Sequence, residues 1–216
     1  MTGEVVETLR MTDSFGLGES HSEMEGASLA PVIARARAGD SAAFEQIMDH
    51  CQRKVVSTAW RMLGNREDAR DAAQEVFLRA YKYLGSFDAG QDFSGWLYRI
   101  TINVCRDIAR KRGRVDQFKS FESEREKGNL ETLASGETLE AAAIHSEQQE
   151  IIAQALSTLS KKERAAIVLR DLEGLPTDEV ARILGSSQAT VRSQIASARA
   201  KIKQHRDRVM RRGRRG

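Results

Sequence analysis

Helical periodicity of apolar residues limits the fold of this 216-residue chain more than any other feature of its sequence. In the longest example, between Asp40 and Gly64, apolar side chains keep an i, i+3, i+4 spacing for about six helical turns. The sequence contains only two prolines, and it is rich in Ala, Leu, Arg and Glu, which favour helices. Few segments alternate polar and apolar residues as strands do. We therefore predict an all-α fold.

Charged residues are segregated along the chain, although the formal net charge is only +3. Residues 1–27 contain six acidic residues and one arginine, and residues 116–150 contain nine acidic residues and three basic ones. Acidic segments without an apolar stripe are typical of disordered chain. In chain order, we predict a disordered acidic tail (1–27), a small helical domain (28–114), a flexible acidic linker (115–142), a second small helical domain (143–210) and a basic tail (211–216).

Both predicted domains end in clusters of Lys and Arg, within residues 106–114 and 199–215. Two such clusters indicate a polyanionic partner such as nucleic acid. The alternative is that cations near helix C-termini only complement the helix macrodipole. No run approaches the roughly 18 consecutive apolar residues of a membrane span, and the N-terminus lacks the pattern of a secretory signal. We therefore expect a cytoplasmic protein without membrane insertion.

Two helices of the first domain present candidate binding faces. The helix predicted after Asn65 has a polar, mostly acidic stripe at spacings of three and four, formed by Asp68, Asp71, Gln74 and Glu75. We expect Asp68 and Asp71 to be exposed, and the stripe can also be an ordinary solvated face. The helix predicted from Phe93 interleaves aromatic and basic residues, which suits single-stranded nucleic acid. The alternative for Phe93 and Trp96 is a place in the core.

The second domain has the spacing of a helix-turn-helix. Ala181 allows two helices to cross closely, Gly185 permits a positive φ in the turn, and Val191 follows on the second helix. The helix after Ser187 is the predicted recognition helix. Its outward residues can read base edges in the major groove, and they are Gln188, Thr190, Arg192, Ser193, Gln194 and Ser197. Arg199 and the cations beyond it are better placed for phosphates.

Several motifs together resemble one family. They are Ala-Gly-Asp-Ser-Ala-Ala-Phe at 38–44, Asp-Ala-x-Asp-x-x-Gln-Glu-x-Phe at 68–77, Phe-x-x-Trp-Leu-Tyr-Arg-Ile-x-x-Asn at 93–103, Gly-Leu-x-x-x-Glu-Val-Ala-x-Ile-Leu-Gly at 174–185 and Thr-Val-Arg-Ser at 190–193. In this order they resemble bacterial RNA polymerase sigma factors, and the two-domain layout is similar to the extracytoplasmic-function (ECF) group. The resemblance covers nearly all of residues 31–203.

The resemblance implies partners and site residues. It implies that the stripe formed by Asp68, Asp71, Gln74 and Glu75 binds core RNA polymerase. It implies that the minus-ten element of promoter DNA is melted and bound by Ser86, Phe87, Asp88, Phe93, Trp96, Arg99, Asn103, Arg106 and Arg110. It implies that the minus-thirty-five element is bound by Gln188, Thr190, Arg192, Ser193, Gln194, Ser197 and Arg199. The family commonly has arginines at the positions of Gln194 and Ser197, which leaves the preferred promoter sequence open. Whether an anti-sigma protein binds the chain is also open.

Two other functional classes fit the sequence less well than an initiation factor. A free-standing helix-turn-helix regulator would fit the composition, but it has no use for a strand-melting face or for the acidic stripe. An enzyme is disfavoured, because the four histidines lie far apart and no nucleophile-plus-base set stands out. We therefore expect no catalytic residues, no cofactor and no metal. Cys51 and Cys105 are expected to be buried small apolar groups.

Overall fold

The computed structural model describes residues 22–118 and 151–213, and its contacts divide the chain into two units. We call residues 22–118 the N-terminal unit and residues 151–213 the C-terminal unit. Both units consist of helices and turns, and neither described range contains a β-strand, so the predicted all-α fold is confirmed. None of the described helices is long and apolar enough to cross a membrane.

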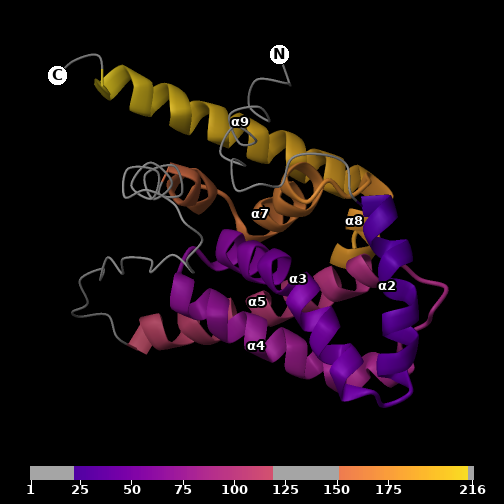
Figure 1. Cartoon of the computed structure of the whole chain (residues 1–216). Coiled ribbons are helices and arrows are strands. Elements are labelled where there is room, and N and C mark those ends of the chain that lie inside the picture. The colour runs from indigo at the N-terminus through magenta and orange to yellow at the C-terminus, as the bar shows by residue number, and fades with distance from the viewer. Residues whose placement is uncertain (1–21, 119–150, 214–216) are drawn as a thin grey trace, which may run out of the picture. The chain divides into compact units, whose positions relative to one another are not determined.

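The N-terminal unit is built from helices that share one core (Figure 1). They are α2 (Ser22–Arg37), α3 (Ser41–Leu63), α4 (Arg66–Tyr83), the short 3-10 helix η1 (Leu84–Ser86) and α5 (Phe93–Phe118). Helix α3 packs against α2 and α4, and α5 packs against both α3 and α4. Ile47, Val76 and Ile102 are fully buried where α3, α4 and α5 meet. Cys51 and Cys105 are also buried, as expected, and burial raises the pKa of Cys105 to about 12.

Local signals in the sequence explain the turn between α3 and α4. Asp40 caps α3 by accepting a hydrogen bond from the backbone N–H of Ala43 at 3.0 Å. Gly64 ends the helix with φ of 70°, a left-handed conformation that glycine adopts readily. Asn65 then caps α4 by accepting from the backbone N–H of Asp68 at 2.9 Å. The two helices therefore meet through a turn of two residues, where the sequence indicated a break.

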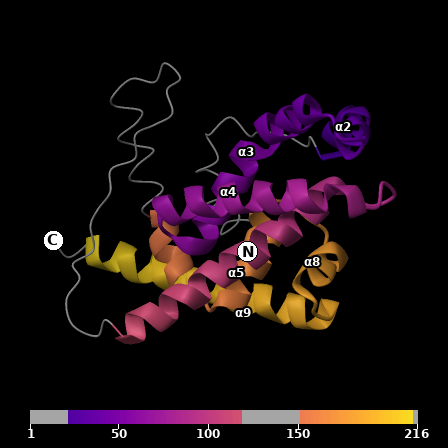
Figure 2. The same cartoon turned by 90° about the horizontal axis from the view of Figure 1, so that it is seen from below.

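The C-terminal unit contains the predicted helix-turn-helix. Residues 151–157 are helical, and they are followed by α7 (Lys161–Ile167), the π-helix η2 (Val168–Leu172), α8 (Thr177–Leu184) and α9 (Gln188–Gly213). A capping box between Ser160 and Glu163 starts α7. Gly185 has φ of 62° between α8 and α9, which lie side by side in Figure 2. Val180 and Val191 are fully buried across this turn.

Three helices extend beyond the domain limits that we expected. Helix α2 begins at Ser22 within the predicted tail, α5 reaches Phe118 within the predicted linker, and α9 continues to Gly213 within the basic tail. Apolar periodicity marks only the part of a helix that packs on a core, so it gives no signal for turns beyond the last buried residue. The rest of the predicted tail and linker lies outside the described residues.

Replacing Gly64 by Ala is expected to destabilise the N-terminal unit by about 1–2 kcal/mol. No atom lies within 4 Å of a Cβ added there, so the cost comes from the positive φ alone. Urea unfolding followed by tryptophan fluorescence measures it, because Trp60 and Trp96 both belong to this unit. Gly85→Ala is the control, since that position is equally open and lacks a positive φ. Equal stability of the two variants would contradict this account of the turn.

Candidate functional site

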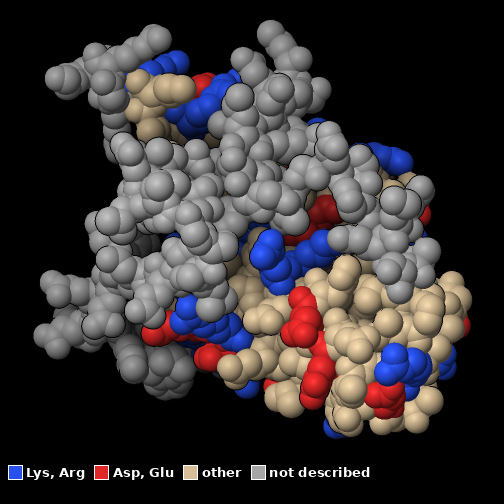
Figure 3. Space-filling view, in the orientation of Figure 1, with Lys and Arg blue, Asp and Glu red and all other residues tan. Residues whose placement is uncertain are grey.

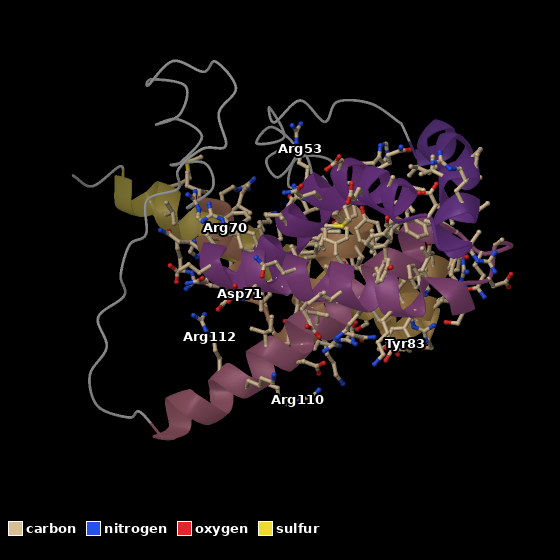
Figure 4. The ribbon with its side chains drawn as sticks, turned by 60° about the horizontal axis from the view of Figure 1, so that its bottom comes forward. Arg53, Arg70, Asp71, Tyr83, Arg110 and Arg112 are labelled. Atoms are coloured by element: carbon tan, nitrogen blue, oxygen red, sulfur yellow. The ribbon has the colours of Figure 1, made fainter. Side chains whose placement is uncertain are left out.

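The acidic stripe of α4 is less exposed than the sequence suggested. Asp71 and Gln74 are exposed, but the Asp68 side chain is only 16% exposed and forms an ion pair with Arg112 of α5. The expectation of an exposed Asp68 is therefore wrong, because the first turn of α4 lies against α5. Burial raises the pKa of Asp68, since desolvation outweighs the attraction of Arg112. Figure 4 shows Arg112 pointing toward α4, whereas Arg110 points away from it.

Glu75 also takes part in contacts within the unit. Its Oε1 accepts a hydrogen bond from Nε of Arg79 at 2.6 Å, and Nη1 of Arg79 donates to Asp107 of α5 at 3.3 Å. These side chains are about two-fifths exposed, so the network is accessible to solvent while it joins α4 to α5. The hydrogen bond that Arg79 donates to Glu75 raises the pKa of Arg79. Of the predicted stripe, Asp71 and Gln74 are thus the most available for a partner.

Two exposed apolar residues extend this face of α4, and sequence analysis missed them. Leu78 is 66% exposed and Tyr81 is 58% exposed, at four and seven residues after Gln74. The rings of Tyr81 and Phe44 pack edge to face, with their centroids 5.0 Å apart. Over the N-terminal unit, at the lower right of Figure 3, acidic and basic side chains lie within a largely uncharged surface. The exposed face of α4 is therefore mixed rather than simply acidic.

Aromatic residues at the start of α5 belong mainly to the core. Phe87, Phe93 and Trp96 pack together with ring centroids 5.1 to 5.4 Å apart. Phe87 is only 3% exposed and Phe93 is buried as well. Neither ring can stack on a base in this conformation, so the core alternative holds for Phe93, and Phe87 is a core residue as well. The cluster instead supports the loop that leads into α5.

Polar residues around this cluster are available to a ligand. Ser86, Asp88, Arg99, Asn103 and Arg110 are exposed, and Arg106 is half-buried. Asp92 fixes the start of α5 by accepting from the backbone N–H of Gly95 at 2.5 Å. Residues 99, 103, 106 and 110 follow one another at spacings of three and four, so they share one face of α5. That face combines an amide with three guanidinium groups, which suits a nucleic-acid strand.

Helix α9 divides into an exposed beginning and an anchored middle. Gln188, Thr190, Arg192 and Ser193 are exposed in its first two turns. Ser187 accepts from the backbone N–H of Thr190 at 3.1 Å, which stabilises this end of the helix. Nη2 of Arg192 donates to Oε1 of Gln188 at 2.9 Å, and Gln194 is half-buried.

The middle of α9 is tied to two carboxylates of the unit. Nε and Nη2 of Arg199 donate to Asp171 of η2 at 2.8 and 2.7 Å, and the Asp171 side chain is 3% exposed. The Ser197 hydroxyl donates to Glu163 of α7 at 2.6 Å, and Nζ of Lys201 donates to both Glu163 oxygens at 2.8 Å. Ser197 and Arg199, both predicted to contact DNA, are therefore engaged within the unit. Their partners are far away in sequence, so no local pattern could reveal them.

The pKa of Glu163 is lowered from its ordinary 4.5 to about 2 by the hydrogen bonds that its carboxylate accepts. The donors are Lys201, Ser197 and the backbone N–H of Ser160. The carboxylate is therefore fully ionised near neutral pH. Among the described residues, no group of three or more His, Cys, Asp or Glu could hold a metal ion.

Replacing Glu163 by Gln is expected to destabilise the C-terminal unit by about 2–3 kcal/mol at pH 7. A lowered pKa stabilises the fold above about pH 4.5, and this stabilisation is lost as the pH falls toward 2. The difference between wild type and variant should therefore shrink at pH 3. Native-state hydrogen exchange of the α9 amides measures this difference in the free energy of unfolding.

Asp178→Asn is the matched control, because Asp178 pairs with Arg182 at 3.5 Å on the exposed surface of α8. Such a pair contributes about 0.5 kcal/mol or less. Equal effects of the two substitutions at pH 7 would contradict the anchoring role of Glu163.

Comparison with known proteins assigns both units. Residues 47–115 match sigma-70 region 2, and residues 149–202 match sigma-70 region 4. The ECF RNA polymerase sigma factor SigW of Bacillus subtilis is 36% identical over 179 residues, which cover 81% of this chain and 95% of the relative. The ECF RNA polymerase sigma-E factor of Escherichia coli is 34% identical over 179 residues, which cover 79% of this chain and 90% of the relative.

Solved structures agree with this assignment. The structure of CnrH in complex with the cytosolic domain of CnrY has a TM-score of 0.61 and 26% identity, and the match covers 82% of this chain and 96% of that one. The sigma factor RpoE of Bartonella quintana, solved with the anti-sigma factor NepR, shares the fold with a TM-score of 0.60 and 24% identity, over 74% of this chain and 94% of that one. Given relatives above 30% identity that match over at least nine-tenths of their length, this chain belongs to the extracytoplasmic-function group of bacterial RNA polymerase sigma factors.

Proposed function

We propose that this sigma factor binds core RNA polymerase through α4, melts the minus-ten element with α5 and reads the minus-thirty-five element with α9. The observation that carries the proposal is the presence of a region 2 unit followed by a region 4 helix-turn-helix on one chain. A free-standing regulator would need only the second. We further propose that the chain acts in the cytoplasm as an initiation factor without catalytic activity of its own.

Run-off transcription with purified core polymerase on genomic fragments tests this function. The proposal expects transcripts that start at defined promoters and depend on the chain. Specific DNA binding by the chain alone, without any polymerase-dependent transcript, would instead support a free-standing regulator. An anti-sigma protein is a further proposed partner, because an anti-sigma factor binds this fold in the solved RpoE complex.

The polymerase contact is proposed to centre on Asp71 and Gln74, with Glu75 at its edge. Leu78 and Tyr81 extend the same face and would add apolar contact area. Asp68 remains part of the proposed surface only through its ion pair with Arg112, which holds α5 against α4.

Charge reversal of Asp71 to Lys is expected to weaken binding of core polymerase about tenfold, because an exposed interfacial charge changes sign. The far-UV circular dichroism should stay unchanged, since Asp71 is exposed. Glu45→Lys, on the exposed face of α3, is the control with the same change of charge. A salt-dependent anisotropy titration with core enzyme distinguishes them. Wild-type affinity of the Asp71 variant would remove α4 as the main contact.

Strand opening is proposed to use Asn103 with the loop from Ser86 to Asp88, while Arg99, Arg106 and Arg110 hold phosphates. Asn103→Ala is expected to reduce open complexes on duplex promoter and to cost less on a template already mismatched at the minus-ten element. A base must be unpaired and unstacked, at a few kcal/mol, only in the duplex. Permanganate footprinting reports the opening. An equal loss on both templates would point to general phosphate binding.

A further inference from the structure

An ion-pair network joins the two candidate binding faces of the N-terminal unit. It consists of Glu75 and Arg79 of α4 with Asp107 and Arg110 of α5, and we call it the α4–α5 network. Nε of Arg79 donates to Oε1 of Glu75 at 2.6 Å, and Nη1 donates to Oδ2 of Asp107 at 3.3 Å. Nη2 of Arg110 lies 3.6 Å from the other carboxylate oxygen of Asp107. Glu75 borders the proposed polymerase contact, and Arg110 is one of the proposed phosphate contacts.

The side chains of this network can exchange partners without movement of the helices. Val76 and Ile102 are fully buried where α4 and α5 pack together, which fixes both backbones. The side chains of Arg79, Asp107 and Arg110 all reach solvent. Arg110 points away from α4 in Figure 4, and its approach to Asp107 is the longest contact of the network. Exposed side chains change rotamer rapidly, so an incoming partner can redistribute these contacts.

The charges of the network balance one another, because it contains two carboxylates and two guanidinium groups. If Arg110 alone turned to a DNA phosphate, one cation and two anions would remain beside that phosphate and repel it. If a cation of polymerase alone took Glu75, two cations and one anion would remain and attract a phosphate. When both partners bind, Arg79 and Asp107 remain as a balanced pair. Binding of one partner therefore favours binding of the other.

We propose that the α4–α5 network couples the two faces: core polymerase, by engaging Glu75, releases Arg110 for a phosphate of the melted strand. Once Glu75 has another partner, Arg79 turns fully to Asp107. Asp107 then gives up its longer contact with Arg110. The coupling is reciprocal, so the melted strand also strengthens polymerase binding by the same factor. This inference rests on the proposed binding of polymerase by α4 and of DNA by α5.

The test measures how much core polymerase strengthens binding of a single-stranded oligonucleotide of minus-ten sequence. Fluorescence anisotropy gives the dissociation constant of the oligonucleotide from the full chain alone and from the holoenzyme. Their ratio is the coupling factor, and comparing its value between variants cancels the contacts that core polymerase itself makes with the oligonucleotide. Exposed ion pairs are individually weak, so removal of one network residue should lower the coupling factor by about threefold.

Asp107→Asn removes the carboxylate that holds Arg110. The free chain should therefore bind the oligonucleotide about threefold more tightly. The holoenzyme should change by less than about 1.5-fold, because Arg79 already neutralises Asp107 there. Asp49→Asn, on the exposed surface of α3, is the control with the same loss of charge, and it should leave the coupling factor unchanged.

Arg79→Gln should have the opposite pattern, because it leaves Asp107 to Arg110 whether or not polymerase is bound. The holoenzyme should bind the oligonucleotide about threefold more weakly, while the free chain changes little. Arg79→Lys should recover part of the coupling, since an ammonium group still pairs with a carboxylate. In the reciprocal titration, saturating oligonucleotide should strengthen core binding by about threefold less in Arg79→Gln than in wild type.

Equal changes of the free chain and the holoenzyme, in either variant, would overturn the proposal. Asp107 would then only repel the strand, and Arg79 would only attract it or support the packing of α4 on α5. A coupling factor that Asp49→Asn lowers as much as Asp107→Asn does would also overturn it. Promoter-dependent transcription by the wild-type holoenzyme is scored separately. Its absence would contradict the proposed function, whereas its presence with unchanged coupling in the variants would contradict only the role of the network.

Discussion

The position of α9 depends on two carboxylates that lie beneath it. Asp171 binds the guanidinium of Arg199, and Glu163 accepts from Ser197 and Lys201. A carboxylate buried this deeply is tolerated only when charged partners satisfy it. If α9 rotated or slid, it would leave a buried carboxylate without its partner. The middle of α9 therefore fixes the position of its first two turns, although these turns make few contacts with the unit themselves.

The N-terminal unit uses the same device on the helix proposed to bind DNA. Asp68 of α4 pairs with Arg112 of α5, and Arg79 of α4 bridges Glu75 and Asp107. In both units, ion pairs with a neighbouring helix hold the helix that carries the candidate DNA contacts. Residues that look like one functional stripe in the sequence are thus divided between holding a helix in place and remaining available on the surface.

The sequence predicted the helices and the residues near their ends well, because these depend on neighbours in the chain. Asp40, Asn65 and Gly185 act where local patterns placed them. It predicted the availability of side chains less well, since that depends on partners distant in sequence. The burial of Asp68 depends on α5 and its Arg112, and the engagement of Arg199 depends on Asp171, which lies 28 residues earlier in the chain. The aromatic residues Phe93 and Trp96 were consistent with a place in the core and with binding of a ligand. Only the packing of their rings in the structure distinguishes the two roles.

The central claim is that the first two turns of α9 read bases while its middle anchors the helix to the unit. The most direct test measures the affinity of the Arg192→Ala holoenzyme for promoters with a preferred or a scrambled minus-thirty-five sequence. Arg192 is exposed in the first two turns, where side chains reach base edges. The account predicts a loss of about 1–3 kcal/mol on the preferred sequence and little change on the scrambled one. An equal loss on both would contradict it, because Arg192 would then bind phosphates and the reading role would belong to other residues.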